Sequence, residues 1–448
     1  MLQLANILYS RGFAITIMHT SFNAPNPSNY PDFNFHSIHI SSLEANEVEV
    51  STTGVTDVIA LLTSLNITFV NPFKEALRQL ILESLQEEEP VTCLITDADW
   101  HFTQEVADSL RLSRIVLRTS NVSSFLAYEP LPLFYEKGYL PVQACRADEE
   151  IPEFPPLKAK DLPQVETQRK DDMLHLVDSM MRTIKASAGL IWNTSQDLEH
   201  SNLLKSSKLF KVPNFALGPF HKHFPCISKS SLLGEDLTSI PWLNSNQAPR
   251  SVLYISFGSI ATVTEAEALE IAWGIVNSQQ PFLWVVRPKS VENSEWIEFL
   301  PEEFHRAVAG KGHIVRWAPQ EEVLAHPSTG AFWTHCGWNS ILEGICKGVP
   351  MICAPSFGDQ LVNARYVSDV WKVGIHLEGK VERGVIERAV KKLMVDGGEG
   401  EEIRARVGDL KEKMEVCVKI GGSSYEAVDQ LVHHILGFCI SGGGEASN

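Results

Sequence analysis

Residues 330–334 read Gly-Ala-Phe-Trp-Thr and are followed at once by His335-Cys336-Gly337-Trp338-Asn339-Ser340. The apolar run predicts a buried strand, and the Gly-containing stretch after it predicts a tight turn. A helical pattern then continues through residue 343. Strand, turn and helix start in this order make a natural anion site, because the first N–H groups of the helix lack helical partners and lie at the positive end of its dipole.

Four residues of this turn can serve an anion directly. Gly337 lets the backbone approach a ligand closely. His335 can donate a hydrogen bond to a phosphate oxygen, and Asn339 and Ser340 add side-chain donors. The alternative for Asn339 and Ser340 is simple helix capping, which the same residue types favour.

Strand and helix signals alternate on both sides of this stretch. Alternation of this kind predicts βαβ units and parallel sheets covered by helices. The strands we expect are 13–18, 91–95, 115–117, one ending near Asn193, and 251–257, 282–286, 312–316, 330–334 and 350–354. The helices are 105–110, 265–277, 384–394, 401–418 and 423–436. The fold class is therefore α/β, with two doubly wound, Rossmann-like domains whose strand ends line a cleft.

A Gly-, Pro- and Ser-rich stretch at 218–240 reads as a linker between the two domains. We predict a first domain at 1–217, a second at 241–422, and a last helix at 423–437 that packs back on the first. The chain opens with a helical pattern at residues 1–8. Because a parallel sheet rarely begins with an uncovered helix, we expect a further strand upstream of Met1.

Composition narrows the class of protein. The chain has 448 residues, a net charge of −17 and a pI near 5.4, which argues against a nucleic-acid or anionic-membrane surface. Its eight cysteines are scattered without a CxxC pair, so we expect reduced thiols and no disulfide framework or zinc site. No secretory signal and no run of 18 apolar residues is present, and we expect a cytoplasmic protein that does not insert in a membrane.

Other strand ends carry ligand-binding side chains. The turn Ser256-Phe257-Gly258-Ser259 could add donors to the same anion site, although glycine turns after strands are common. Trp317 follows strand 312–316 and could stack on a flat base, or be a core or rim tryptophan. Asp359 and Gln360 follow strand 350–354 and suit sugar hydroxyls, or could simply solvate and shape a loop.

The stretch that begins at Trp317 and ends at Gln360 resembles the plant secondary product glycosyltransferase box, whose length of 44 residues it also shares. The resemblance extends over essentially the whole chain. Further details look like the plant UDP-glycosyltransferase 76 subgroup: residues 1–8, Ile95-Thr96-Asp97, Trp284-Val285-Val286-Arg287-Pro288 and Asn363-Ala364-Arg365-Tyr366. The resemblance implies a GT-B fold, in which the first domain binds the acceptor and the second domain binds the UDP-sugar. It implies no cofactor and no metal.

Carried over residue by residue, the resemblance assigns a donor site. Trp317 would stack on uracil, and the backbone of Ala318 would bind the edge of the base. Gln320 would also be a donor-binding residue. Glu343 would hold the ribose hydroxyls. The diphosphate would be bound by His335, Asn339 and Ser340, with Ser259 contributing less. The sugar would be held by Trp338, Asp359 and Gln360, and Gln360 is similar to glucose-using members, which favours UDP-glucose.

The resemblance also implies how the reaction proceeds. A His deprotonates the acceptor and an Asp orients that His, in a direct displacement that inverts the sugar carbon. Asp97 matches the Asp, although alone it could be a turn or cap residue. The matching His would lie four positions before Met1. His19 and His101 are poorer substitutes. Three explanations are open: a truncated version of an active glycosyltransferase, a short form that binds UDP-sugar with little turnover, or an enzyme in which another residue or the acceptor itself supplies the base.

We expect the acceptor pocket in the first domain, with Trp100, Ser120, Asn121, Phe125 and residues 130–134 as candidates. Each of them could instead be a packing residue. The subgroup implies a small lipophilic acceptor of terpenoid, cytokinin or phenolic type, modified at a hydroxyl, carboxyl or amine. We expect a monomer. A nicotinamide-binding Rossmann protein is disfavoured because no GxGxxG follows a first strand.

Overall fold

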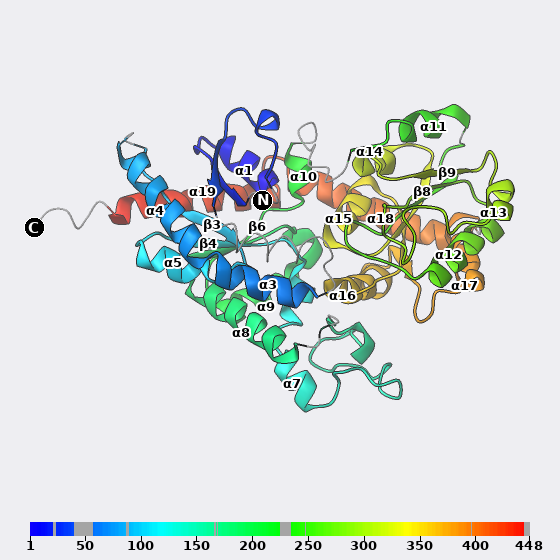
Figure 1. Ribbon diagram of the computed structural model, residues 1–448, viewed down its shortest axis with the longest axis horizontal. Coiled ribbons are helices and arrows are strands. Elements are labelled where there is room, and N and C mark those ends of the chain that lie inside the picture. The colour runs from blue at the N-terminus through cyan, green and yellow to red at the C-terminus, as the bar shows by residue number, and fades with distance from the viewer. Residues whose placement is uncertain are drawn as a thin grey trace, which may run out of the picture. The chain divides into compact units, whose positions relative to one another are not determined.

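The structure is a computed structural model that describes residues 1–20, 24–39, 57–86, 89–164, 167, 169–224, 234–246, 248–395 and 397–442. The chain forms two compact α/β units (Figure 1). The first comprises Met1–Lys137, Val165–Lys229 and Cys417–Asn448, and the second Gly138–Gln164 and Ser230–Val416. Residues 138–164 thus pack with the second unit, although the sequence analysis places them in the first domain. Residues 225–233 of the predicted linker lie outside the described residues.

The first unit contains two parallel sheets in its described part. Strand β1 (Thr16–Thr20) pairs with β2 (Asn34–Ile38). The other sheet has the order β3-β4-β5-β6, with β3 at Leu94–Asp97, β4 at Arg114–Arg118, β5 at Gly189–Trp192 and β6 at Asn214–Ala216.

Helices surround these strands. Helix α1 (Leu2–Tyr9) and the last helix, α19 (Ser423–Gly442), share one apolar cluster with β4, in which Leu4, Leu117 and Leu431 are buried. The other helices of this unit are α3 (Val58–Thr68), α4 (Val70–Gln86), α5 (Thr103–Ser109), α6 (Val122–Leu126), α7 (Leu131–Glu136), α8 (Lys170–Ala186), α9 (Gln196–Phe210) and α10 (Phe220–His223).

The second unit contains a parallel sheet of six described strands in the order β12-β11-β10-β7-β8-β9. Their bounds are β7 Val252–Ser256, β8 Phe282–Val285, β9 Gly312–Val315, β10 Thr329–Thr334, β11 Met351–Cys353 and β12 Gly374–His376. The chain runs outward from β7 to β9 and then returns to the other side of β7 as β10. The carboxyl ends of β7 and β10 therefore meet at a topological switch point, where sheets of this kind bind ligands.

Helices cover both faces of this sheet, as the all-buried pattern of β7 and β10 requires. Helix α12 (Glu265–Ser278) starts with a capping box, in which Thr264 and Glu267 exchange side-chain to backbone hydrogen bonds. The remaining helices are α11 (Ser239–Asn246), α12 (Glu265–Ser278), α13 (Glu302–Ala307), α14 (Gln320–Ala325), α15 (Trp338–Lys347), α16 (Asp359–Arg365), α17 (Arg383–Met394), α18 (Glu399–Cys417), the 3-10 helix Ala159–Asp161 and the π-helix Tyr366–Val370.

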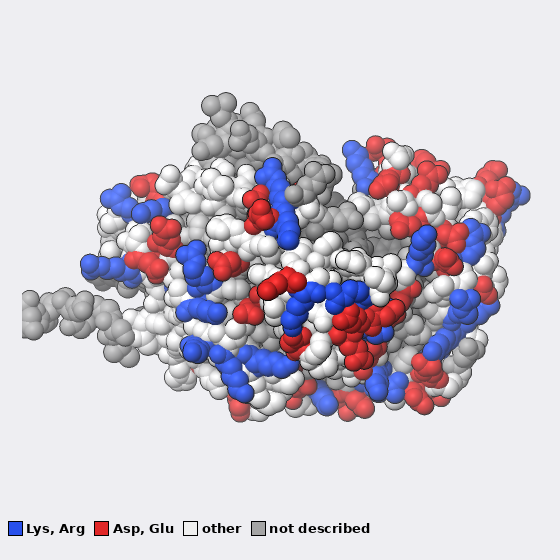
Figure 2. Space-filling model, turned by 90° about the horizontal axis from the view of Figure 1, so that it is seen from below, with Lys and Arg blue, Asp and Glu red and all other residues white. Residues whose placement is uncertain are grey.

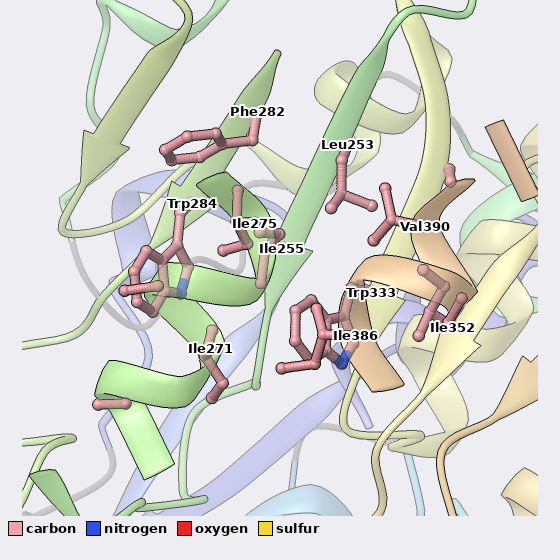
Figure 3. Close-up of a cluster of buried hydrophobic side chains, with 14 of the residues drawn as sticks. Leu253, Ile255, Ile271, Ile275, Phe282, Trp284, Trp333, Ile352, Ile386 and Val390 are labelled. Carbon is pink, nitrogen blue, oxygen red and sulfur yellow. The ribbon is translucent and has the colours of Figure 1, made fainter. Parts of the chain in front are cut away.

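Figure 3 shows the main core of this unit, where strand side chains meet α12 and α17. Trp284 and Trp333 rise from the sheet towards Ile271 of α12 and Ile386 of α17. This packing confirms the α/β fold class that the sequence predicts.

Gly274→Ala is expected to destabilise the protein, because a Cβ at Gly274 would lie 2.6 Å from the Cβ of Ile386. Overpacking of this kind costs about 1–3 kcal/mol. The matched control is Gly408→Ala in α18, where a Cβ meets nothing within 4 Å. That change should stabilise the helix by roughly 0.5–1 kcal/mol. Urea unfolding measures both free energies, and equal shifts would contradict the tight contact between α12 and α17.

Candidate functional site

Two glycine turns lie side by side at the switch point. Ser256 at the end of β7 is the register partner of Thr334 at the end of β10. The imidazole of His335 fills the space between the turns that follow. A Cβ on Gly258 would lie 2.4 Å from two ring atoms of His335, and a Cβ on Gly337 would lie 2.5 Å from its Nε2. Glycine is therefore required on both sides of the ring.

The His335 ring is neutral at physiological pH. Burial, assisted by the Arg287 guanidinium, lowers the pKa of His335 to about 4. A neutral imidazole carries one N–H, which can be donated either to the neighbouring Ser256 backbone or to an anion, and the ring brings no charge of its own.

The N-terminus of α15 begins directly after this ring. Its N-cap is Gly337, which makes no side-chain cap, and Cys336 before it has a left-handed backbone with φ of 67°. Thr334 stabilises the turn by accepting a hydrogen bond from the Cys336 N–H at 3.1 Å. Asn339 and Ser340 lie inside the first helical turn, so neither is the N-cap residue. This geometry suits an anion at the helix start.

A buried carboxyl lies one turn further along α15. Gln320, at the start of α14, donates from Nε2 to Glu343 Oε2 at 2.7 Å and to Ser340 Oγ at 3.0 Å. The Tyr254 hydroxyl in turn donates to Gln320 Oε1 at 3.2 Å. Burial raises the pKa of Glu343 to about 7. Gln320 thus aligns Glu343 and Ser340 on one side of the switch point.

The segment after β9 begins with two of the predicted donor-site residues, Trp317 and Ala318. Trp317 is half-buried, and its carbonyl accepts a hydrogen bond from the Asp236 N–H at 2.9 Å. Ala318 is buried. Ser259, in the other glycine turn, is exposed. Trp338 is buried, with its ring 6.0 Å from that of Trp371.

The turn before α16 is fixed by side chains of the helix itself. Gln360 Oε1 accepts hydrogen bonds from the N–H groups of Ser356 at 2.9 Å and Phe357 at 3.3 Å. Asn363 Nδ2 donates both to Asp359 Oδ2 and to the Cys336 carbonyl, each at 3.0 Å. Asn363 therefore ties Asp359 to the His335 turn. The sequence analysis gave it no role, although its i,i+4 spacing from Asp359 was a usable signal.

Asp97 ends β3 in the first unit. Its Oδ1 accepts a hydrogen bond from the Asp99 N–H at 3.0 Å, and Arg118 Nη1 lies 3.7 Å away. Burial and the neighbouring Asp99 carboxylate raise the pKa of Asp97 to about 6, against the opposing effect of Arg118. A carboxyl in this state is poised near neutral pH, as acid–base chemistry requires.

The two histidines that could substitute for the predicted base, His19 and His101, lie in different surroundings. His19 Nδ1 donates to the Thr20 carbonyl at 3.1 Å, and its ring lies against Phe35. Burial, and to a lesser extent the electrostatic effect of His175, lowers the pKa of His101 to about 4. Such a low pKa makes His101 a weak base near neutral pH.

The acceptor candidates occupy packing and capping positions. Trp100 lies in an aromatic cluster, 5.5 Å from the Phe102 ring. Asn121 caps α6 by accepting from the Ser124 N–H at 3.1 Å, and Phe125 is fully buried. Ser120 accepts a hydrogen bond from Arg118 Nε at 3.1 Å.

Sequence reasoning missed Glu199, a buried carboxylate that holds the start of α6. It accepts hydrogen bonds from the N–H groups of Val122 at 3.1 Å and Ser123 at 3.0 Å. Burial raises its pKa. Nothing in its local sequence distinguishes it from a surface glutamate, because its partners lie far away along the chain.

Other classes of site find little support in the described chain. No group of three His, Cys, Asp or Glu side chains among the described residues could hold a metal ion. None of the described helices is both long and apolar enough to cross a bilayer. On the face drawn in Figure 2, Lys and Arg are interspersed with Asp and Glu, so its described residues form no continuous basic patch.

Known proteins resemble this chain closely. A model of the UDP-glucoronosyl and UDP-glucosyl transferase family matches residues 236–404. The chain is 51% identical to UDP-glycosyltransferase 76B1 of Arabidopsis thaliana, over 98% of the chain and 95% of that protein. It is 46% identical to UDP-glycosyltransferase 76G1 of Stevia rebaudiana, over 97% and 93% respectively. A solved structure, Phytolacca americana UGT2 complexed with UDP-2fluoro-glucose and pterostilbene, has a TM-score of 0.78 at 26% identity, over 97% of this chain and 96% of that one.

Gly258→Ala should destabilise the protein more than Gly310→Ala. Both glycines have positive φ, 72° and 77°, so both substitutions incur the strain of a left-handed backbone, about 1 kcal/mol. Only at Gly258 does the new Cβ meet the His335 ring, which adds roughly 1–3 kcal/mol. Urea unfolding of the two variants gives the difference, and equal losses would show that the ring moves aside freely.

Proposed function

This chain belongs to the plant UDP-glycosyltransferase family, in its family 76 subgroup, and we propose that it transfers glucose from UDP-glucose to a small lipophilic plant metabolite. The observation that carries the donor assignment is the pair of glycine turns around His335 at the start of α15. In this proposal the second unit binds the UDP-sugar and the first unit binds the acceptor. We also propose that the protein acts in the cytoplasm.

The donor roles follow from the chemistry of each position. His335, Asn339 and Ser340 bind the diphosphate, where a helix start and a neutral imidazole provide N–H donors, with Ser259 contributing less. Glu343 accepts from the ribose hydroxyls, and Gln320 aligns it. Trp317 stacks on uracil and the Ala318 backbone binds its edge. Trp338, Asp359 and Gln360 hold the glucose.

In the proposed reaction, the acceptor atom attacks C1 of glucose from the face opposite the diphosphate. The bond between C1 and the β-phosphate oxygen breaks, UDP leaves with the electron pair, and the configuration at C1 inverts. The acceptor proton passes to a general base, which Asp97 orients and balances in charge. The N–H donors around His335 stabilise the charge that develops on the leaving diphosphate.

The acceptor is a small molecule with a hydroxyl, carboxyl or amine, of terpenoid, cytokinin or phenolic type. The Phytolacca americana relative was solved with pterostilbene, a phenolic compound, which supports this class. Trp100, Ser120, Asn121 and Phe125 remain predicted pocket residues. Incubation with UDP-glucose and a panel of such acceptors, followed by mass spectrometry of the products, tests the function.

A second candidate is a protein that binds UDP-sugar with little turnover. The carboxylate of Asp97 is engaged by Arg118 and by the Asp99 N–H. Among the described residues, no imidazole forms a hydrogen bond with this carboxylate. Loss of a general base costs about 10²–10⁴-fold in rate. Binding of UDP-glucose without product would favour this candidate.

Glu343→Gln should remove a pH dependence of UDP binding. The pKa of Glu343 is raised to about 7, so its carboxylate form, which accepts ribose hydroxyls, becomes dominant as pH rises from 6 to 8. We expect UDP affinity of the unmodified protein to increase over this range. In the variant it should be weaker and should lack this increase. Calorimetry at pH 6, 7 and 8 measures both, and parallel pH profiles would contradict the ribose role.

Asp97→Asn should lower glucosyl transfer by about 10²-fold or more while UDP affinity stays unchanged, because an amide orients and balances a base poorly. Asp99→Asn is the matched control, since Asp99 shares Arg118 as a partner at 2.7 Å. Initial rates with saturating UDP-glucose measure the effect. If product forms equally fast without the Asp97 carboxylate, the assignment of Asp97 fails.

A further inference from the structure

Residues Gly138–Gln164, which we call the strap, leave the first unit after Lys137 and return to it at Val165. Between these points the strap packs with the second unit. Its own backbone hydrogen bonds, such as Ile151 N–H to the Leu157 carbonyl at 2.8 Å, give it a defined local structure. Ile151 is fully buried, as expected of a segment that is built into its unit.

A buried ion pair joins the strap to the last residue of α16. Arg365 Nε donates to Asp161 Oδ2 at 2.8 Å and its Nη2 to Oδ1 at 3.1 Å, a bidentate arrangement. The side chains are 4% and 2% exposed. Arg365 also contacts Asp369 at 2.9 Å and Glu378 at 2.6 Å, so each of its three nitrogens has a carboxylate partner.

The strap also contacts Gly358, the N-cap residue of the same helix. The Gly358 N–H donates to the Gln164 carbonyl at 2.6 Å. Gly358 immediately precedes Asp359 and Gln360, the residues proposed to hold the glucose. Helix α16 is therefore fixed by the strap at both of its ends.

A buried ion pair is weak evidence for stability, because apolar residues of the same volume often stabilise as well. Its fixed bidentate geometry does define where its two elements lie. Here the two elements are the strap and the short helix that begins with Asp359 and Gln360. A displacement of reacting or binding groups by about 1 Å can cost about 10²-fold in rate.

From this arrangement we infer that Asp161 and Arg365 are positioning residues for the sugar of the donor. They act through α16 mainly on Asp359 and Gln360, and less on the diphosphate contacts, to which α16 is linked through the hydrogen bond of Asn363 to the Cys336 carbonyl. The inference rests on the proposed function, since it presupposes that the second unit binds UDP-glucose. It makes the strap, outside the segment 317–360, part of the donor site.

The test compares affinities for UDP and UDP-glucose by calorimetry in the full chain. Asp161→Asn removes a charge, and Arg365→Lys keeps the charge but loses the bidentate fork. The matched control is Arg383→Lys. Arg383 also pairs with a carboxylate, but its side chain is 49% exposed, and its pair with Glu270 joins α17 to α12. Thermal melting verifies that each variant is folded, and Arg365→Lys alone decides the question if Asp161→Asn does not fold.

We expect the ratio of the dissociation constants, UDP-glucose over UDP, to rise about tenfold in Asp161→Asn and by less in Arg365→Lys. UDP affinity should change much less than UDP-glucose affinity, and the ratio in Arg383→Lys should not change. Parallel weakening of both ligands, or an unchanged ratio, would overturn the inference. Absence of UDP-glucose binding by the unmodified protein would instead refute the proposed function, so the two failures are distinguishable.

Discussion

The contact of the His335 imidazole with two glycine turns is the constraint on which the second unit depends. The ends of β7 and β10 can approach each other only because Gly258 and Gly337 have no side chains. That approach exists because the chain runs from β7 outward to β9 and returns as β10 on the other side of β7. The sheet order brings the two turns together, and burial of the ring between them then requires glycine in both turns and keeps the imidazole neutral.

Two carboxyls with raised pKa values lie in different units, Asp97 at the end of β3 and Glu343 within α15. Glu343 is raised to about 7 by burial, and Asp97 to about 6 by burial and by Asp99. In both cases the cause is a low-dielectric environment that opposes the charged form, only partly offset by hydrogen bonds. The protein maintains these carboxyls at a cost in stability, which is typical of groups retained for binding or chemistry.

Much of the second unit could be predicted from sequence because its signals are local. Strands β7, β8, β10 and β11 are rich in buried apolar residues, and the turn at residues 335–340 has a recognisable composition. The short strand β12 (Gly374–His376) was missed, since three residues give no periodic pattern. The roles of Asn363 and Glu199 were missed as well. Each depends on partners that only the folded chain brings near, such as the Cys336 carbonyl for Asn363.

The assignment of residues 138–164 to the first domain followed from their place in the sequence, and the structure groups them with the second unit. This has a consequence for exchanging parts between related enzymes. A chimera joined once, within residues 218–240, would combine the Asp161 of one parent with the Arg365 of the other. The second unit is therefore not one continuous stretch of the sequence. A transfer of this unit to another protein has to include the strap, its 27 upstream residues, as a separate segment.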